Sequence, residues 1–197
     1  MPVPSAVSAA AAPTILLLPG LNNSGDGHWQ TYWEQMLPTA QRVQQQDWDT
    51  PCRQDWVNTL DAAIQASNGP VVLAAHSLGC ALVAWWVAEH GNCQGSAAMV
   101  KGALLVAPPD VERADFPASV RDFGPMPRMA LPFDTIVVGS DNDSWCEITK
   151  IQSFSADWKA TFHNIGALGH LNAASGLRDW QQGRTWLAQV GRMQSVV

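Results

Sequence analysis

Short apolar runs alternate with longer stretches of helical periodicity along this chain of 197 residues. A run of four to eight apolar residues between turn residues is typical of a strand, and apolar positions recurring every three or four residues indicate a helix. These patterns predict strands at residues 14–18, 42–46, 71–75, 102–107, 135–138 and 159–163. They predict helices at residues 29–37, 53–67, 78–89, 144–155 and 173–190.

The order and character of these elements indicate the fold class. Several of the predicted strands are apolar throughout, as in parallel sheets that helices cover on both faces. We therefore expect an α/β fold, a three-layer sandwich with a mostly parallel sheet of about six strands. Right-handed crossovers bring the carboxyl ends of such strands to one edge of the sheet, where ligands bind. Residues 110–131, rich in Pro and charge, are expected to be a surface excursion and a candidate cap over that edge.

Composition favours one globular domain. Apolar residues make up 47% of the chain and charged residues 14%. This is enough apolar surface to build a core. We expect a single domain over residues 14–197. Residues 1–13 are rich in Ala, Ser and Pro, and are interpreted as a flexible tail, since they lack the basic start and leucine-rich centre of a secretory signal.

The candidate chemistry centres on Ser77, in the sequence Ala75-His76-Ser77-Leu78-Gly79. A strand precedes this small-x-Ser-x-Gly pattern and a helix follows it, which is the setting of a nucleophile elbow. The following helix is apolar nearly all round and is expected to be buried. Cys80, one turn into it, is interpreted as a core residue. His76 is interpreted as a packing and hydrogen-bonding residue.

A serine needs a base to remove its proton, and the chain supplies candidates after later strands. His170 follows the last predicted strand, and Asp141 and Asp143 follow the strand at 135–138. Serine, acid, histidine is the chain order of the catalytic triad on an α/β-hydrolase sheet. The imidazole would take the proton and the acid would orient the imidazole. From the residues alone, either aspartate fits the role of the acid.

Two backbone N–H groups are candidates for an oxyanion hole. Leu78 follows the nucleophile at the start of the buried helix, and Leu21 lies in the loop after the first strand. Such groups can hold the oxygen on which charge develops. Asn22 and His28, in the same loop, are candidates for the substrate cleft. The alternative for His28 is that it caps the next helix.

Six short segments together resemble the retinoblastoma-binding protein 9-like, or YdeN-type, small serine hydrolases of the α/β-hydrolase superfamily. They stand at residues 18–20, 27–30, 75–79, 106–110, 139–143 and 169–172. The resemblance implies a small enzyme with little or no lid that cleaves small esters or amides. We therefore expect a serine hydrolase that acts on a small ester, thioester or amide through an acyl-enzyme. It also implies a triad of Ser77, Asp143 and His170, with Asp141 as the alternative acid. The chain departs from the family pattern at Ala75, where glycine is usual, and at Ser144, where many relatives have proline.

The net charge and the spacing of the histidines, cysteines and glycines restrict which partners and cofactors we expect. The net charge of −6 argues against nucleic acid and anionic membranes, and no apolar run is long enough to span a bilayer. The histidines and cysteines show no metal-ligand spacing and the glycines form no nucleotide-binding loop, so we expect no metal and no cofactor. Four cysteines without paired spacing indicate free thiols and a cytoplasmic location.

Two other functions use the same fold. One is a protein-binding role with weak or no catalysis, for which a Leu-x-Cys-x-Glu motif would be diagnostic. The nearest approach, Trp145-Cys146-Glu147, has the wrong spacing. The other is acyl transfer to an acceptor other than water.

Overall fold

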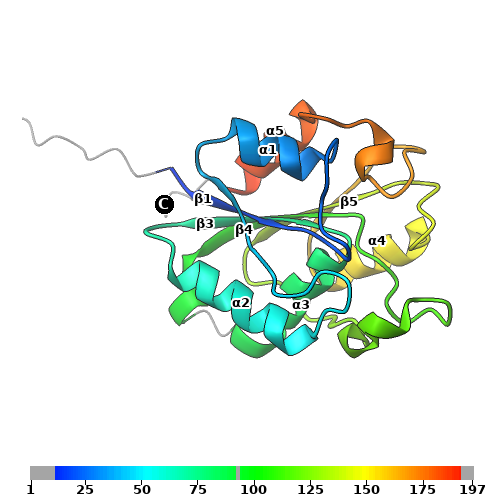
Figure 1. Cartoon of the computed structure of the whole chain (residues 1–197), viewed down its shortest axis with the longest axis horizontal. Coiled ribbons are helices and arrows are strands. Elements are labelled where there is room, and N and C mark those ends of the chain that lie inside the picture. Colours follow the sequence, from blue (N-terminus) through cyan, green and yellow to red (C-terminus); the bar gives the residue numbers. More distant parts are fainter. Residues whose placement is uncertain (1–11, 92–93, 192–197) are drawn as a thin grey trace, which may run out of the picture.

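Six parallel strands form one continuous sheet in the computed structural model, which describes residues 12–91 and 94–191 (Figure 1). Most of the predicted tail at residues 1–13 lies outside this range, as does Cys93. The strands are β1 (Thr14–Leu18), β2 (Ala40–Arg42), β3 (Val71–His76), β4 (Val100–Val106), β5 (Asp134–Gly139) and β6 (Thr161–Asn164). Their order is β2-β1-β3-β4-β5-β6, which confirms the expected α/β class.

The strand order reverses direction between β1 and β3. The chain first moves outward from β1 to β2 and then returns to build β3 to β6 on the other side of β1. Loops after strands diverge at such a switch point and leave a crevice at the carboxyl ends. Ser77 follows β3 and therefore lies beside this crevice.

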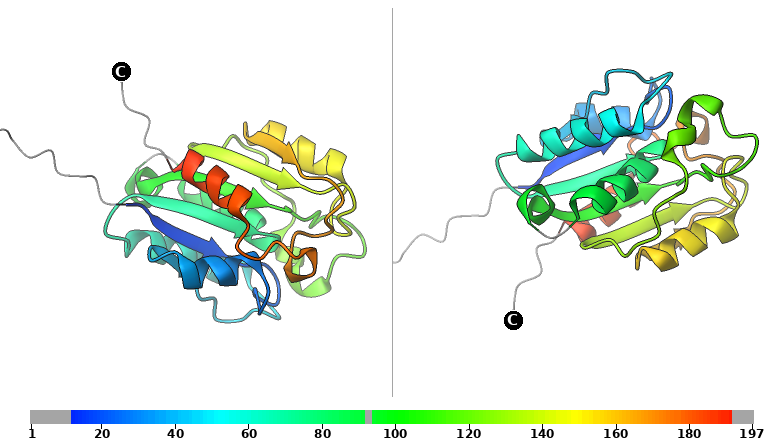
Figure 2. Two further views of the ribbon diagram at one scale, coloured as in Figure 1. Left: turned by 90° about the horizontal axis from the view of Figure 1, so that it is seen from above. Right: turned by 90° about the horizontal axis from the view of Figure 1, so that it is seen from below.

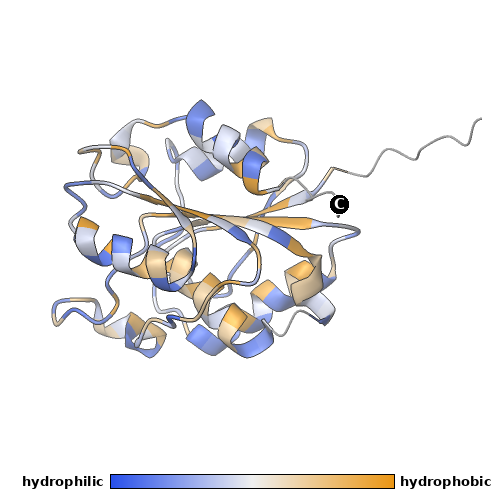
Figure 3. Cartoon of the chain, turned by 180° about the vertical axis from the view of Figure 1, so that it is seen from behind, coloured by the Kyte–Doolittle hydropathy of each residue, from blue (hydrophilic) through white to orange (hydrophobic). Residues whose placement is uncertain are grey.

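Helices cover both faces of the sheet (Figures 1 and 2). On one face lie α1 (Trp29–Met36) and α5 (Gln181–Val190), and on the other lie α2 (Arg53–Gln65), α3 (Leu78–His90) and α4 (Ile148–Asp157). Successive strand residues point to opposite faces, so each strand feeds both cores. In β1, for example, Leu17 joins the core under α1 and α5, whereas Leu16 and Leu18 join the other. Figure 3 shows apolar residues along the sheet, which lies between helices that carry both apolar and polar residues.

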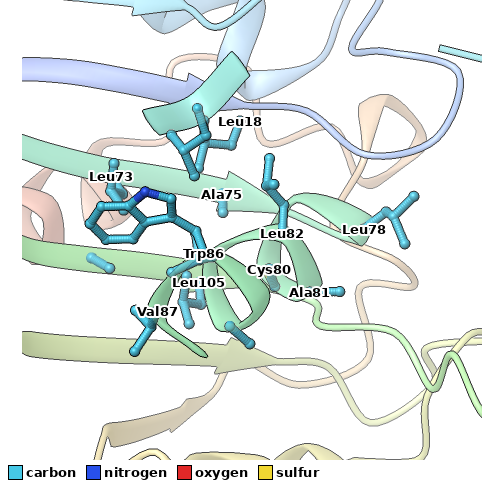
Figure 4. Packing of buried hydrophobic residues seen from close by; sticks show 14 of the residues in the cluster. Leu18, Leu73, Ala75, Leu78, Cys80, Ala81, Leu82, Trp86, Val87 and Leu105 are labelled. Carbon is cyan, nitrogen blue, oxygen red and sulfur yellow. The ribbon is translucent and has the colours of Figure 1, made fainter. Parts of the chain in front are cut away.

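Helix α3 is buried, as its sequence predicts. Its residues from Leu78 to Ala84 are all buried, and so are Trp86 and Val87. Figure 4 shows Trp86 and Leu82 packed near Leu18 and Leu73. The first turns of α3 are buried, so packing on every side fixes the position of Leu78, the residue directly after Ser77.

Three predicted elements differ from the structure by more than two residues at one end. The strand predicted at 42–46 is three residues long and ends at Arg42. The helix predicted at 144–155 begins at Ile148, because the loop that carries Asp143 occupies the residues before it. The helix predicted at 173–190 is wrong as one element: a 3-10 turn at Ala173–Ser175 and α5 are separated by residues with positive φ, Gly176 at 66° and Trp180 at 34°.

The excursion at 110–131 contains one short 3-10 helix, η2 (Ala118–Phe123), and a second 3-10 helix, η1 (Gly95–Met99), precedes β4.

Within the described ranges, no helix has both the length and the apolar character needed to cross a bilayer.

Candidate active site

Ser77 occupies a sharp turn between β3 and α3. Its φ is 53° and its ψ is −123°. L-residues rarely adopt this region, and such backbone strain is concentrated at functional sites. Two hydrogen bonds hold the turn: Ser77 N–H donates to the Val106 carbonyl at 2.9 Å, and Cys80 N–H donates to the Ser77 carbonyl at 2.8 Å. This is the geometry of a nucleophile elbow.

Two glycines allow the chain to approach the elbow closely. A Cβ on Gly79 would lie 2.2 Å from the Leu18 carbonyl oxygen, and one on Gly20 would lie 2.8 Å from Ser77 Cβ. Both positions therefore require glycine. At Ala75, where the family pattern led us to expect glycine, the methyl group is fully buried in the core on the α3 side of the sheet (Figure 4). The core accommodates this departure.

A continuous hydrogen-bonded chain joins Ser77 to a buried carboxylate. His170 Nε2 lies 2.7 Å from Ser77 Oγ, and His170 Nδ1 lies 2.8 Å from Asp143 Oδ2. The Asp143 side chain is fully buried and that of His170 is 10% exposed. Because a carboxylate only accepts, Nδ1 carries the proton and donates it to Asp143, so Nε2 accepts from the Ser77 hydroxyl.

Asp141, the other acid candidate, has a different role in the structure. It is exposed, and its Oδ1 accepts a hydrogen bond from Asn164 Nδ2 at 2.6 Å. Its N–H donates to the Gly166 carbonyl at 3.0 Å. Asp141 thus ties the loop after β5 to the end of β6, and the structure brings only Asp143 to the His170 ring.

The loop that carries His170 is held by side chains that the sequence analysis missed. Ser140 Oγ accepts from Leu168 N–H at 2.9 Å, and Asn142 Oδ1 accepts from Gly169 N–H at 2.7 Å. The available signal was the run of short polar residues after β5, since such side chains commonly bond to neighbouring backbone. These bonds fix the loop of His170 to the residues that follow β5.

Two aromatic side chains hold the same loop from within. The His76 ring nitrogen Nε2 lies 2.8 Å from the His170 carbonyl, and Trp29 Nε1–H donates to the Leu171 carbonyl at 3.1 Å. Burial, followed by the nearby His170 and His28, holds the pKa of His76 well below its usual value. His76 is therefore a neutral donor that packs and hydrogen-bonds, as expected.

A pocket of about 230 Å³ lies over Ser77, and its lining includes the cleft candidates Asn22 and His28 and the oxyanion-hole candidate Leu21. Its other lining residues are Asn23, His76, Ser77, Leu78, Phe116, Pro117, Trp145, His170 and Asn172. Hollows of about 540 and 340 Å³ lie at the amino ends of the strands, away from Ser77. We assign the site to the smaller pocket because only there do a nucleophile and a base meet.

Aromatic residues form one wall of this pocket. The Trp145 ring lies 5.7 Å from Phe116 and 6.2 Å from His170, and Trp145 is 37% exposed. Phe116 and Pro117 come from the excursion at 110–131, which reaches the site as a cap would. This wall was not predicted from the sequence, where its only signal was Trp145, two residues after Asp143.

The N–H groups of Leu21 and Leu78 have no hydrogen-bond partner among the described residues. Both residues line the pocket beside Ser77. Unpaired backbone donors beside a nucleophile are suited to bind a developing oxyanion.

His28 lies at the start of α1 and in the lining of the Ser77 pocket. Its Nδ1 accepts from Gln30 N–H at 3.1 Å and so caps α1, and its ring also belongs to the pocket lining. Burial, reinforced by the charges of Arg42 and His170, lowers the pKa of His28 to about 3. The ring is therefore neutral near pH 7.

The two buried thiols, Cys80 and Cys146, supply no alternative nucleophile. Burial raises the pKa of Cys80, and it raises that of Cys146 to about 12. Neither residue therefore forms a thiolate near pH 7. Among the described residues, no group of His, Cys, Asp or Glu has the arrangement of a metal site.

The fold and the site together define the class of the protein. A parallel sheet that carries a strained serine, Ser77, at its switch point, hydrogen-bonded to His170, is that of an α/β-hydrolase. A family model described as serine hydrolase matches residues 15–189, and the chain belongs to this serine hydrolase family. Hydrolase activity follows from that membership. No curated protein sequence matches the chain.

Solved structures support the same assignment. A YdeN-like hydrolase from Pectobacterium atrosepticum is 28% identical, with a TM-score of 0.78 over 90% of each chain. The ydeN gene product of B. subtilis is 17% identical, with a TM-score of 0.70 over 90% of this chain and 98% of its own. The monoacylglycerol lipase of Paleococcus ferrophilus shares the fold at 9% identity, with a TM-score of 0.64 over 92% of this chain and 96% of its own. The resemblance to YdeN-type serine hydrolases is confirmed.

Proposed function

We propose that this chain hydrolyses a small ester, thioester or amide, with Ser77 as nucleophile, His170 as general base and acid, and Asp143 as the orienting carboxylate. One observation carries the proposal: the unbroken hydrogen-bonded chain from Ser77 Oγ through the His170 ring to Asp143, with distances of 2.7 and 2.8 Å. A serine and an imidazole within hydrogen-bond reach, with the imidazole held by a third group, are the arrangement of an activated nucleophile.

Each group has one task in the reaction. Ser77 Oγ attacks the carbonyl carbon while its proton passes to His170 Nε2. His170 then gives that proton to the leaving alcohol, thiol or amine, and the acyl group remains on Ser77. Water attacks the acyl-enzyme after losing a proton to His170, and the acid product leaves as Ser77 recovers its proton. Asp143 keeps Nδ1 protonated and stabilises the imidazolium that forms twice in each cycle.

The N–H groups of Leu21 and Leu78 hold the oxyanion of both tetrahedral intermediates. Removing one such donor in a serine hydrolase costs about 3–4 kcal/mol of transition-state stabilisation. The first turn of α3 adds the partial positive charge of a helix N-terminus beside Leu78. Gly20 lets the loop of Leu21 approach Ser77 closely, since a Cβ at this position would lie 2.8 Å from Ser77 Cβ and 3.1 Å from Leu78 N.

The volume of the pocket limits the substrate. The pocket of about 230 Å³ is smaller than the range of roughly 300–1,000 Å³ typical of drug-sized ligands. The acyl group is therefore short, and Phe116, Pro117 and Trp145 supply its apolar contacts. A cytoplasmic location belongs to the same proposal and is supported by the free thiols of Cys52, Cys80 and Cys146, since thiols stay reduced there.

A fluorophosphonate probe, which phosphonylates an activated serine with loss of fluoride, tests the nucleophile. We expect the wild type to be labelled and Ser77→Ala to be unlabelled. Ser153→Ala, at an exposed position of α4, is the matched control that retains labelling. A panel of p-nitrophenyl esters and aminoacyl amides then measures hydrolysis. Labelling that survives Ser77→Ala would show that the nucleophile is another residue.

A further inference from the structure

Arg42, the last residue of β2, lies beside the strand end from which the loop of Leu21 departs. In the parallel pairing of β1 with β2, Arg42 is opposite Leu17, one residue before β1 ends. The Arg42 side chain is only 8% exposed. A buried charge is costly unless it is paired and hydrogen-bonded, so the partners of this guanidinium indicate its role.

All five N–H groups of the Arg42 guanidinium have partners. Nη1 donates to Asn23 Oδ1 and to the Ser24 carbonyl, both at 2.7 Å. Nη2 donates to Thr31 Oγ1 at 3.0 Å and lies 2.7 Å from Glu34 Oε2, and Nε donates to the same carboxylate oxygen at 3.0 Å. No donor is left for a substrate, and Arg42 is not among the described residues that line the pocket. Any effect of Arg42 on the reaction must therefore pass through the segments that it holds.

One of these segments forms a strained turn around Leu21. Asn23 N–H donates to the Gly20 carbonyl at 3.1 Å, which closes a four-residue turn, and Asn22 N–H donates to the Trp48 carbonyl at 2.8 Å. Asn22 and Asn23 have φ of 64° and 62°. Asparagine tolerates this left-handed region better than most residues, but such strain persists only where the surrounding structure holds it.

Asn23 connects this turn to Arg42. Its Oδ1 accepts from Arg42 Nη1 and from Ser24 N–H, both at 2.7 Å. Its own N–H closes the turn on the Gly20 carbonyl, so a displacement of Asn23 also displaces Leu21, which lies inside the turn. An oxyanion donor is most effective when it is in place before charge develops on the substrate oxygen. The contact between Arg42 and Asn23 is placed to keep the Leu21 N–H in that position.

We propose that Arg42 is a positioning residue for catalysis: it holds Asn23, and through Asn23 it holds the turn that presents the Leu21 N–H to the oxyanion. The proposal rests on the function proposed for Ser77 and adds a residue outside the pocket on which the rate depends. Because the bound substrate carries no oxyanion before the reaction, the loss of Arg42 should affect kcat and leave substrate binding nearly unchanged.

Substitutions of Arg42 and of its partner Glu34 test this division. Arg42→Lys retains the charge and the long side chain, but a lysine has no planar fork that can bond Asn23 and Glu34 at the same time. With p-nitrophenyl butyrate, we expect kcat to fall about tenfold and KM to change by less than about twofold. Arg42→Met, which removes every donor, should lower kcat at least as far.

Glu34→Gln is the matched control. Its amide oxygen can still accept from Arg42, and the bonds from Arg42 to Asn23 and Ser24 are untouched. Its kcat should stay within about twofold of the wild type. A loss in Glu34→Gln equal to that in Arg42→Lys would show that the ion pair to α1 affects the rate, and would overturn the proposal. So would a wild-type kcat in both Arg42 variants.

A double-mutant cycle tests whether the effect passes through the Leu21 N–H. Leu21→Pro removes that N–H, and the turn suits a proline there, because a residue of positive φ follows as in a type II turn. Leu21→Ala, which shortens the same side chain and keeps the N–H, is the reference for the lost packing. We expect Leu21→Pro to lower kcat on the order of 100-fold relative to Leu21→Ala. In the Leu21→Pro background, Arg42→Lys should then cost less than about twofold.

The outcomes separate this proposal from the function proposed for Ser77. Fluorophosphonate titration counts the active molecules, so an unfolded fraction is not mistaken for a lower kcat. A tenfold loss from Arg42→Lys that persists in Leu21→Pro would overturn the positioning role, and so would a Leu21→Pro protein with the kcat of Leu21→Ala. If circular dichroism shows that Leu21→Pro does not fold, the comparison of Arg42→Lys with Glu34→Gln still decides. Absence of labelling in the wild type would instead overturn the proposed function.

Discussion

Gly79→Ala tests whether the close approach of α3 to β1 determines the geometry of the site. The added Cβ would lie 2.2 Å from the Leu18 carbonyl oxygen and 3.0 Å from that of Pro19. Ordinary contact begins at 3.4 Å, so the first turn of α3 must move away from β1 until the shorter distance reaches that value. Backbone atoms provide both contacts, and β1 is hydrogen-bonded to a strand on each side, so neither neighbour can simply rotate away.

The expected losses follow from this displacement. Forcing extra volume into a packed core costs typically 1–3 kcal/mol, and a backbone clash of this size belongs at the upper end, about 3 kcal/mol. For a domain of this length, each kcal/mol lowers Tm by roughly 2–4 °C, so Tm should decrease by about 6–12 °C. A misplacement of about 1 Å costs on the order of 100-fold in rate, because Ser77 and the Leu78 N–H move with the helix.

Thermal unfolding followed by circular dichroism and the hydrolysis of p-nitrophenyl butyrate provide the two measurements. Gly69→Ala is the matched control, because a Cβ there meets nothing within 4 Å. It should retain both Tm and activity. A Gly79→Ala protein with the Tm and kcat/KM of the control would refute the reasoning, since the helix would then have found room without disturbing the elbow.

Three further predictions follow from single residues. Asp143→Asn should lower kcat on the order of 10⁴-fold by removing the acceptor that orients His170, whereas Asp141→Asn should stay within about threefold; similar kcat values for the two variants would contradict this. His28 has a pKa of about 3 in the fold and about 6.5 when unfolded, so the unfolded state takes up the proton first and wild-type stability falls as pH decreases below 6.5. His28→Asn should reduce that loss by about 1.4 kcal/mol per pH unit between pH 6 and 4, as measured by urea unfolding. If the free energies of unfolding of the wild type and the variant changed in parallel with pH, the result would be inconsistent with a buried neutral ring. Iodoacetamide should alkylate the exposed Cys52 and leave the buried Cys80 unmodified in the native protein, as read by mass spectrometry; equal labelling would disprove the burial of Cys80.

The sequence by itself determined the fold class and the position of the elbow, because both depend on local pattern. Apolar strands such as β3 and the uniformly apolar α3 are recognisable from consecutive residues. Parallel strands then bring their carboxyl ends together whatever the loops contain, so Ser77 and His170 were expected at one edge. Local pattern failed at residues 173–190, where helical periodicity continues through a break that the positive φ of Trp180 produces.

Only the tertiary structure decided which groups meet at that edge. Asp141 and Asp143 lie on one loop, and their separation into an exposed and a buried carboxylate depends on bonds to Asn164 and His170 from later segments of the chain. The aromatic wall joins Phe116 to Trp145, which lie on opposite sides of β5 in the sequence. The pattern of apolar residues indicates the type of each element and its buried face, because both depend on neighbouring residues. Contacts between loops that are far apart in the sequence depend on how the whole chain folds.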